Sequence, residues 1–181
     1  MTTTMDSEQT KRQLVRRYGL VLLCFMFALI VSGVTAFPLL WELRVLDQAA
    51  GGAPAASATP TDSLGAWISF VREGLEESYR AYPFIAYGTD WLAFSHLVIA
   101  VFFIGPLMRP AEYQWTLISG MIACVGVLFL AFICGPLRGI PFYWQLVDCS
   151  FGVFGILPLL YCYFVSRKLE QIEKNGYSTT L

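Results

Sequence analysis

The sequence predicts an all-α membrane protein: a four-transmembrane-helix bundle with an extra amphipathic helix in the first outside loop. The chain of 181 residues is 56% hydrophobic and only 14% charged, whereas soluble domains usually carry about 25% charged residues. Its apolar residues also stand in long blocks, and each block is close to the roughly 20 residues that a helix needs to cross a bilayer. We therefore expect residues 1–181 to form a single four-span membrane domain.

Four apolar segments are the expected spans, at residues 18–40, 91–108, 115–135 and 142–165. The first segment follows several basic residues and has no charge inside it, as a signal peptide does. It is longer than the roughly 7–15 apolar residues of a signal peptide, so we expect a span that is retained. Two glycine–proline pairs, Gly105-Pro106 and Gly135-Pro136, are expected to end the second and third spans.

The distribution of basic residues indicates the orientation, because positive charge favours the cytoplasmic side. Eight basic residues flank the two termini and the turn after the second span: Lys11, Arg12, Arg16, Arg17, Arg109, Arg167, Lys168 and Lys174. The opposite side has four basic residues, and the long loop on that side carries seven acidic residues. We expect both termini in the cytoplasm and the protein in the bacterial inner (plasma) membrane.

The long outside loop, residues 42–90, has two parts. Residues 49–63 are rich in Ala, Gly, Pro, Ser and Thr, which predicts a flexible linker. Residues 64–79 carry apolar side chains at helical spacing, which predicts the amphipathic helix. This helix either lies in the outer headgroup region, or acts as a lid or a partner surface. Its acidic character favours a lid or a partner surface.

Two ionisable side chains, His96 and Asp148, lie inside expected spans, where a charge is costly and usually faces the bundle interior. Counted from Trp91 and Phe142, they are five and six residues deep, or about 8 and 9 Å at 1.5 Å per residue. We therefore expect them at matching depth in the outer half, where they can meet. The pair is either a structural clasp between helices or part of a site for a quinone-like or haem-like ligand.

Five further polar residues near the outer ends of the spans are candidates for lining the same outer site. They are Gln145, Asp90, Glu42, Arg44 and Arg138. The inner half of the bundle, by contrast, looks like apolar packing, so nearly all of the buried polar character is expected in the outer half.

Small residues at helical spacing predict close packing between helices. Gly152 and Gly155 follow Asp148 on the fourth span, and Gly33 lies on the first. The third span has a patch of small residues: Ser119, Gly120, Ala123, Cys124 and Gly126. The stripe of Gly152 and Gly155 would also leave room for a flat ligand. The five cysteines form no CxxC pair, and we expect them to act as small hydrophobic residues.

Three functions stay open. The sequence has no HExxH, Walker or GxSxG motif, so it indicates no enzyme, and it identifies no cofactor or metal. The favoured function is an accessory or structural subunit that contacts partners through its outer loop and its small-residue helix faces. A small ligand-binding or redox protein with a site at His96 and Asp148 comes second, and a transporter component third. The expected partners are the lipid bilayer and a protein partner or a second copy (homo-oligomer), and no nucleic acid.

Overall fold

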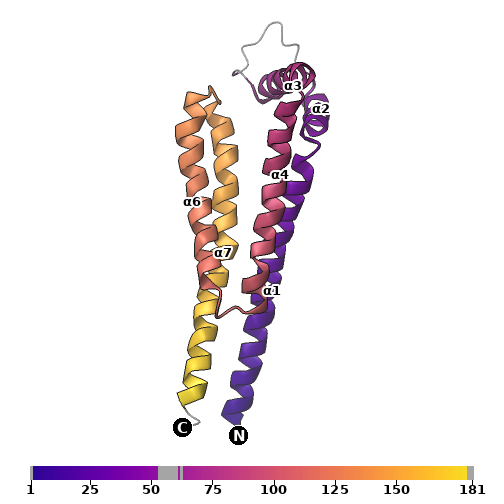
Figure 1. The fold of residues 1–181 in the computed structure, drawn as a ribbon. Coiled ribbons are helices and arrows are strands. Elements are labelled where there is room, and N and C mark those ends of the chain that lie inside the picture. Colours follow the sequence, from indigo (N-terminus) through magenta and orange to yellow (C-terminus); the bar gives the residue numbers. More distant parts are fainter. Residues whose placement is uncertain (1, 53–60, 62, 179–181) are drawn as a thin grey trace. The chain divides into compact units, whose positions relative to one another are not determined.

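The computed structural model describes residues 2–52, 61 and 63–178. Throughout these residues every regular element is a helix (Figure 1). The elements are α1 (Thr2–Ala36), α2 (Leu39–Ala49), α3 (Leu64–Ala81), α4 (Phe84–Phe102), α5 (Ile104–Met108), α6 (Gln114–Leu137) and α7 (Phe142–Ser178). Four stretches are long and apolar enough to cross a membrane: Glu8–Ala36, Phe84–Met108, Gln114–Leu137 and Phe142–Lys174. The all-α class with four candidate spans is thus confirmed for the described residues.

The first candidate span is shorter at its end than predicted, because α1 stops at Ala36 and not at residue 40. Phe37 directly precedes Pro38, and the proline ring disfavours helical backbone in the residue before it. The chain then starts a separate helix, α2, which was not predicted: its residues were expected at the end of the first span and in the long outside loop.

The second candidate span begins at Phe84, seven residues earlier than the predicted start at Trp91. It starts directly after Pro83, and proline suits the first turn of a helix because its backbone nitrogen needs no partner there. The span breaks between α4 and α5 at Phe103. Pro106 explains this position, since its ring clashes with the carbonyl four residues earlier, at Phe102. The Gly105-Pro106 pair therefore lies inside α5 and does not end the span.

The third candidate span runs past Gly135 and ends at Leu137. The chain reverses at Gly139, whose φ of 69° lies in the left-handed region that glycine adopts without strain. Gly139, and not the Gly135-Pro136 pair, is therefore the residue that permits the turn into α7. The fourth span begins at Phe142 as predicted, and α7 continues to Ser178.

The predicted helix at residues 64–79 corresponds to α3. The Ser63 side chain accepts a hydrogen bond from the backbone nitrogen of Ala66 at 3.2 Å, which caps the start of the helix. The helix stops before Tyr82, because Pro83 follows. Of the expected linker, residues 53–60 and 62 lie outside the described residues, and Ala49 belongs to α2.

Contacts within the chain define two compact units: Met1–Ala28 with Ala100–Leu181 (unit 1), and Leu29–Ile99 (unit 2). In unit 1, α6 and α7 lie side by side as an antiparallel hairpin (Figure 1). Its core includes side chains with no exposed surface from the first part of α1, from α6 and from α7, among them Tyr18, Leu22, Leu117 and Leu159. In unit 2, α2 packs against α3 and buries Leu43, Trp67 and Ile68 between them and their neighbours.

Glycines allow the close helix contacts that the sequence predicted. A Cβ atom at Gly152 would lie 2.5 Å from the backbone oxygen of Cys124, so α7 meets the α6 backbone there. A Cβ atom at Gly33 would lie 2.8 Å from the backbone oxygen of Ala93, where α1 meets α4 in unit 2. The packing role of both glycines is confirmed, and α6 occupies the space that a flat ligand would need beside Gly152. Gly126 differs, because nothing lies within 4 Å of its added Cβ.

Candidate functional site

A network of ion pairs joins α2 to α3 in unit 2. The Arg72 Nε donates to Asp47 Oδ2 at 2.8 Å, and the Ser69 hydroxyl donates to the other oxygen of the same carboxylate. Arg72 also contacts Glu76 at 3.0 Å and Glu73 at 3.2 Å on its own helix. We call these five residues, together with Arg44, the α2–α3 ion cluster.

Burial differs within the α2–α3 ion cluster. The side chains of Asp47 and Arg72 are 13% and 21% exposed, and Ser69 is 2% exposed. Arg44 donates to Glu76 at 2.7 Å, but its side chain is 54% exposed. Because exposed ion pairs contribute little to stability, the pair of Asp47 and Arg72 contributes more to the attachment of the two helices than the pair of Arg44 and Glu76 does.

The same contacts change how the carboxyl groups titrate. The hydrogen bond from Ser69 lowers the pKa of Asp47, and Arg72 lowers it further, against the opposing effect of desolvation. The hydrogen bond from Arg44 lowers the pKa of Glu76 in the same way. Both acids are therefore charged at neutral pH, when the cluster is fully formed.

The face of α3 that points away from α2 remains exposed. Phe70, Glu73, Gly74 and Glu77 are exposed and recur at helical spacing along α3. On the far end of the helix, the Tyr79 hydroxyl lies 3.1 Å from the Thr89 hydroxyl of α4. α3 is thus attached to α2 and α4 and presents one acidic face.

His96 and Asp148 lie in different units, so their pairing stays a prediction. Because α4 starts at Phe84, His96 is twelve residues into α4, whereas Asp148 is six residues into α7. Their matching depth in the membrane likewise stays a prediction. His96 is half-buried, and its Nδ1 lies 2.9 Å from the Leu92 carbonyl oxygen. Since a carbonyl only accepts, Nδ1 donates, and Nε2 is the free ring nitrogen. Asp148 is half-buried, without a hydrogen bond to any other described side chain.

Gln145 has a structural role in unit 1. It is 4% exposed, and its Nε2 donates to the Ile140 carbonyl at 2.8 Å. A Cβ atom at Gly135 would lie 2.8 Å from the Gln145 Cδ, so the amide fills the space beside that glycine. Gln145 therefore braces the turn between α6 and α7. Arg138, in the same turn, is exposed.

The remaining predicted residues belong to unit 2. Arg44 is part of the α2–α3 ion cluster. Glu42 is half-buried in the first turn of α2, where a negative charge is favourable at the helix N-terminus. Asp90 lines a shallow pocket of about 230 Å³. The other residues that line it are aromatic: Phe37, Tyr87, Trp91 and Phe94.

Polar contacts are also buried at the end of unit 1 that holds both termini, where the sequence predicted apolar packing with nearly all of the buried polar character at the other end. That prediction is wrong. The buried Tyr18 hydroxyl donates to the Pro106 carbonyl at 3.0 Å, and the buried Ser166 hydroxyl donates to the Pro110 carbonyl at 2.5 Å. The helix break near Pro106 leaves carbonyls without helical partners, and a buried carbonyl needs a donor.

Sequence reasoning missed Asp47, Ser69 and Arg72 as a group. The spacing of Arg72 and Glu76 on one helix was a readable signal. The partner on α2, Asp47, however, is 22 residues from Ser69 and 25 residues from Arg72 in the chain. The aromatic pocket did carry a signal, because Tyr87, Trp91 and Phe94 follow helical spacing.

No family model, curated protein or solved structure matches this chain. The functional argument therefore rests on the residues and their geometry.

Proposed function

We propose that the chain is an integral protein of the bacterial inner membrane, with both termini in the cytoplasm. The protein functions as an accessory or structural subunit that contacts a partner. Four candidate spans support the membrane location, and within their most apolar windows only 11–33% of the residues are buried by the chain itself. The apolar side chains that remain exposed need an apolar phase around them, which lipid and partner helices supply.

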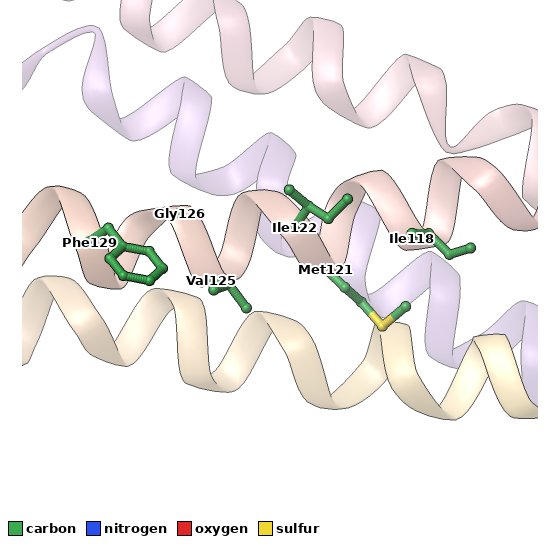
Figure 2. Close-up of a pocket in the computed structure, with 6 residues that line it drawn as sticks. All are labelled: Ile118, Met121, Ile122, Val125, Gly126 and Phe129. Atoms are coloured by element: carbon green, nitrogen blue, oxygen red, sulfur yellow. The ribbon is translucent and has the colours of Figure 1, made fainter.

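The observation that carries the proposal is the outer face of α6. The α6 window is the least buried of the four, at 11%. Along it runs an open, apolar groove of about 380 Å³, and Figure 2 shows its lining residues following one another on this single helix. These residues are Ile118, Met121, Ile122, Val125, Gly126 and Phe129. Gly126 leaves its position open to an approaching backbone, which is how small residues bring membrane helices together.

The acidic face of α3 supports a second contact, with a partner outside the membrane. The contacts of Ser69 and Arg72 with Asp47 hold α3 by its other side, and Phe70, Glu73 and Glu77 stay exposed. An exposed aromatic ring followed by exposed carboxylates on the same helix matches a partner surface that carries Lys or Arg.

The test is to replace Gly126 by Leu, which fills the groove. Ala123→Leu is the matched control, because Ala123 is also a small exposed residue of α6 but does not line the groove. Energy transfer between two labelled populations in liposomes measures association between copies, and crosslinkers placed at Phe70 and Glu77 report a partner outside the membrane.

We expect transfer between wild-type copies and between Ala123→Leu copies, and its loss in Gly126→Leu. Alternatively, a partner span occupies the groove, and Gly126→Leu then releases a copurifying protein that Ala123→Leu retains. A chain that is monomeric in liposomes, copurifies with no protein and gives no crosslink from α3 would refute the accessory role.

A further inference from the structure

Five exposed basic residues lie where the apolar segments of α1 and α7 end, at the end of unit 1 that holds both termini. They are Arg12, Arg16 and Arg17 of α1, and Arg167 and Lys168 of α7. We call these five residues the basic border. On α1 no charged residue follows Arg17 before Glu42, and on α7 none lies between Asp148 and Arg167. The proposed function uses these residues only to orient the chain.

Contacts between α1 and α7 show that the basic border is one continuous band. The Cys162 Sγ of α7 lies 3.9 Å from the Tyr18 carbonyl oxygen of α1, and the Lys11 Nζ lies 3.2 Å from Glu173. The two helices are therefore antiparallel here (Figure 1), and all five basic residues lie between these two contacts. At 1.5 Å per residue the band is about 10–17 Å deep along the helices.

The charges of the basic border are not neutralised within the chain. None of its five residues forms an ion pair in the part of the chain that the structure describes. The carboxylates of α7 at this level are already engaged, since Glu173 pairs with Lys11 and Glu170 pairs with Lys174. Even with the acidic residues that precede it on α1, the band keeps an excess of positive charge, which attracts anions.

Exposed apolar side chains continue the basic border along both helices. On α1, Leu20 and Phe27 follow Arg16 at spacings of four and eleven residues, and both are exposed. On α7, the exposed Phe164 precedes Lys168 by four residues. These spacings keep side chains on one face of a helix. Each cation therefore heads an apolar column, and this order of charge and apolar surface matches an anionic lipid better than a water-soluble polyanion.

We propose that the basic border binds the phosphate headgroups of anionic phospholipids, with Arg16 and Lys168 as the principal contacts. This inference depends on the proposed membrane location of the chain. A guanidinium group binds two phosphate oxygens at once, and an ammonium group binds them as a point charge. Free inorganic phosphate offers the same chemistry, but only a lipid also covers the exposed apolar side chains of Leu20 and Phe164.

The experiment uses the full chain in a maltoside detergent, with equal amounts of phosphatidylglycerol and phosphatidylcholine added. Native mass spectrometry counts the lipids of each class that stay bound. The double variant Arg16→Gln/Lys168→Gln removes two charges of the basic border. The matched control is Arg109→Gln/Lys174→Gln, which removes one arginine and one lysine from the same end of unit 1, where both already form ion pairs.

We expect wild type and the matched control to retain phosphatidylglycerol in preference to phosphatidylcholine. The double variant should bind phosphatidylglycerol about 5–25-fold more weakly, because each basic residue at a membrane surface strengthens the attraction of anionic lipids about fivefold. A second arm titrates sodium phosphate at constant ionic strength. Displacement of phosphatidylglycerol by phosphate identifies the free anion as a sufficient ligand, and its absence identifies the lipid as the source; both results support the proposal.

The proposal is overturned if wild type retains the two lipids equally, if the double variant binds as wild type does, or if the matched control loses as much binding. A nucleic acid or an acidic protein that occupies the basic border in place of lipid overturns it too. Thermal unfolding of each variant accompanies the measurements, and if the double variant does not fold, Arg16→Gln alone decides.

Insertion of the chain into phosphatidylcholine nanodiscs is measured separately. A chain that inserts but shows no preference for phosphatidylglycerol contradicts only the lipid site. A chain that does not insert contradicts the proposed membrane location as well, so the two failures are distinguishable.

Discussion

Replacing Arg72 by Gln removes the cation that pairs with Asp47 of α2. Asp47 then keeps only the hydrogen bond from Ser69. Its carboxylate, with 13% of the side chain exposed, loses the opposite charge 2.8 Å away. Glu73 and Glu76 lose a partner on their own helix as well, but those contacts do not join the two helices.

The size of the effect follows from the burial of the pair. A hydrogen bond to a charged group contributes about 1.5–3 kcal/mol, and an exposed ion pair contributes about 0–1 kcal/mol. Asp47 and Arg72 lie between these limits, so we take about 1–2 kcal/mol for what this pair contributes to the attachment of α3 to α2. That corresponds to a population of detached α3 that increases roughly 5–30-fold.

Hydrogen–deuterium exchange of peptides from α3 measures this population in detergent or nanodiscs. Arg44→Gln is the matched control: it removes the same charge from the same cluster, but Arg44 is 54% exposed. We expect faster exchange throughout α3 in Arg72→Gln and a smaller change in Arg44→Gln. Unchanged exchange in Arg72→Gln, or an equal effect of Arg44→Gln, would refute the role given to the buried pair.

Three further predictions concern the same packing. Asp47 and Glu76 have lowered pKa values when folded, so the stability they contribute is present above their unfolded pKa values of about 4 and is lost as pH falls through that range. Trp67 is 6% exposed, so its fluorescence emission reports this packing in a variant without other tryptophans. The emission should change between about pH 5 and 3 and stay constant from about pH 5 to 8. A transition confined to neutral pH contradicts this prediction. Gly152→Ala should lower the free energy of unfolding by about 1–3 kcal/mol, because the added methyl group overpacks against Cys124. Gly126 has open space around it, so Gly126→Ala should leave the free energy of unfolding unchanged or raise it by up to about 1 kcal/mol. Equal effects in thermal unfolding would contradict the assigned faces. Ser166→Ala removes the donor of the half-buried Pro110 carbonyl and should cost about 0.5–1.5 kcal/mol in thermal unfolding. Ser95→Ala, whose hydroxyl returns to its own helix at Leu92, should change little.

The sequence predicted the helices but not all of their limits. Long apolar blocks identify the spans, because few other arrangements bury so many apolar residues. The limits failed where charge was taken as the end of a helix: Asp90 lies inside α4, which begins after Pro83. In the same way, α2 was not predicted because it carries charged residues: Glu42, Arg44 and Asp47. Proline, which acts on the backbone itself, was the more reliable signal.

The candidate site could be predicted only where its residues are close in sequence. Gly152 and Gly155 lie one turn apart, and the helical period alone places them on one face. The partnership of Ser69 with Asp47 depends on how α3 folds back on α2, and the link from Ser166 to Pro110 spans 56 residues. That second link also exists because a helix break frees a carbonyl, which no local pattern reports.

The central claim, four spans with both termini in the cytoplasm, is tested most directly by cysteine labelling in intact cells. In a variant without the five native cysteines, single cysteines are placed at Thr61, at Ala111 and at Glu8, and a membrane-impermeant maleimide is added. We predict labelling of Thr61→Cys in intact cells, and labelling of Glu8→Cys and Ala111→Cys only after permeabilisation. Labelling of Glu8→Cys in intact cells with protection of Thr61→Cys, or release of the protein from membranes by alkaline carbonate, would contradict the account.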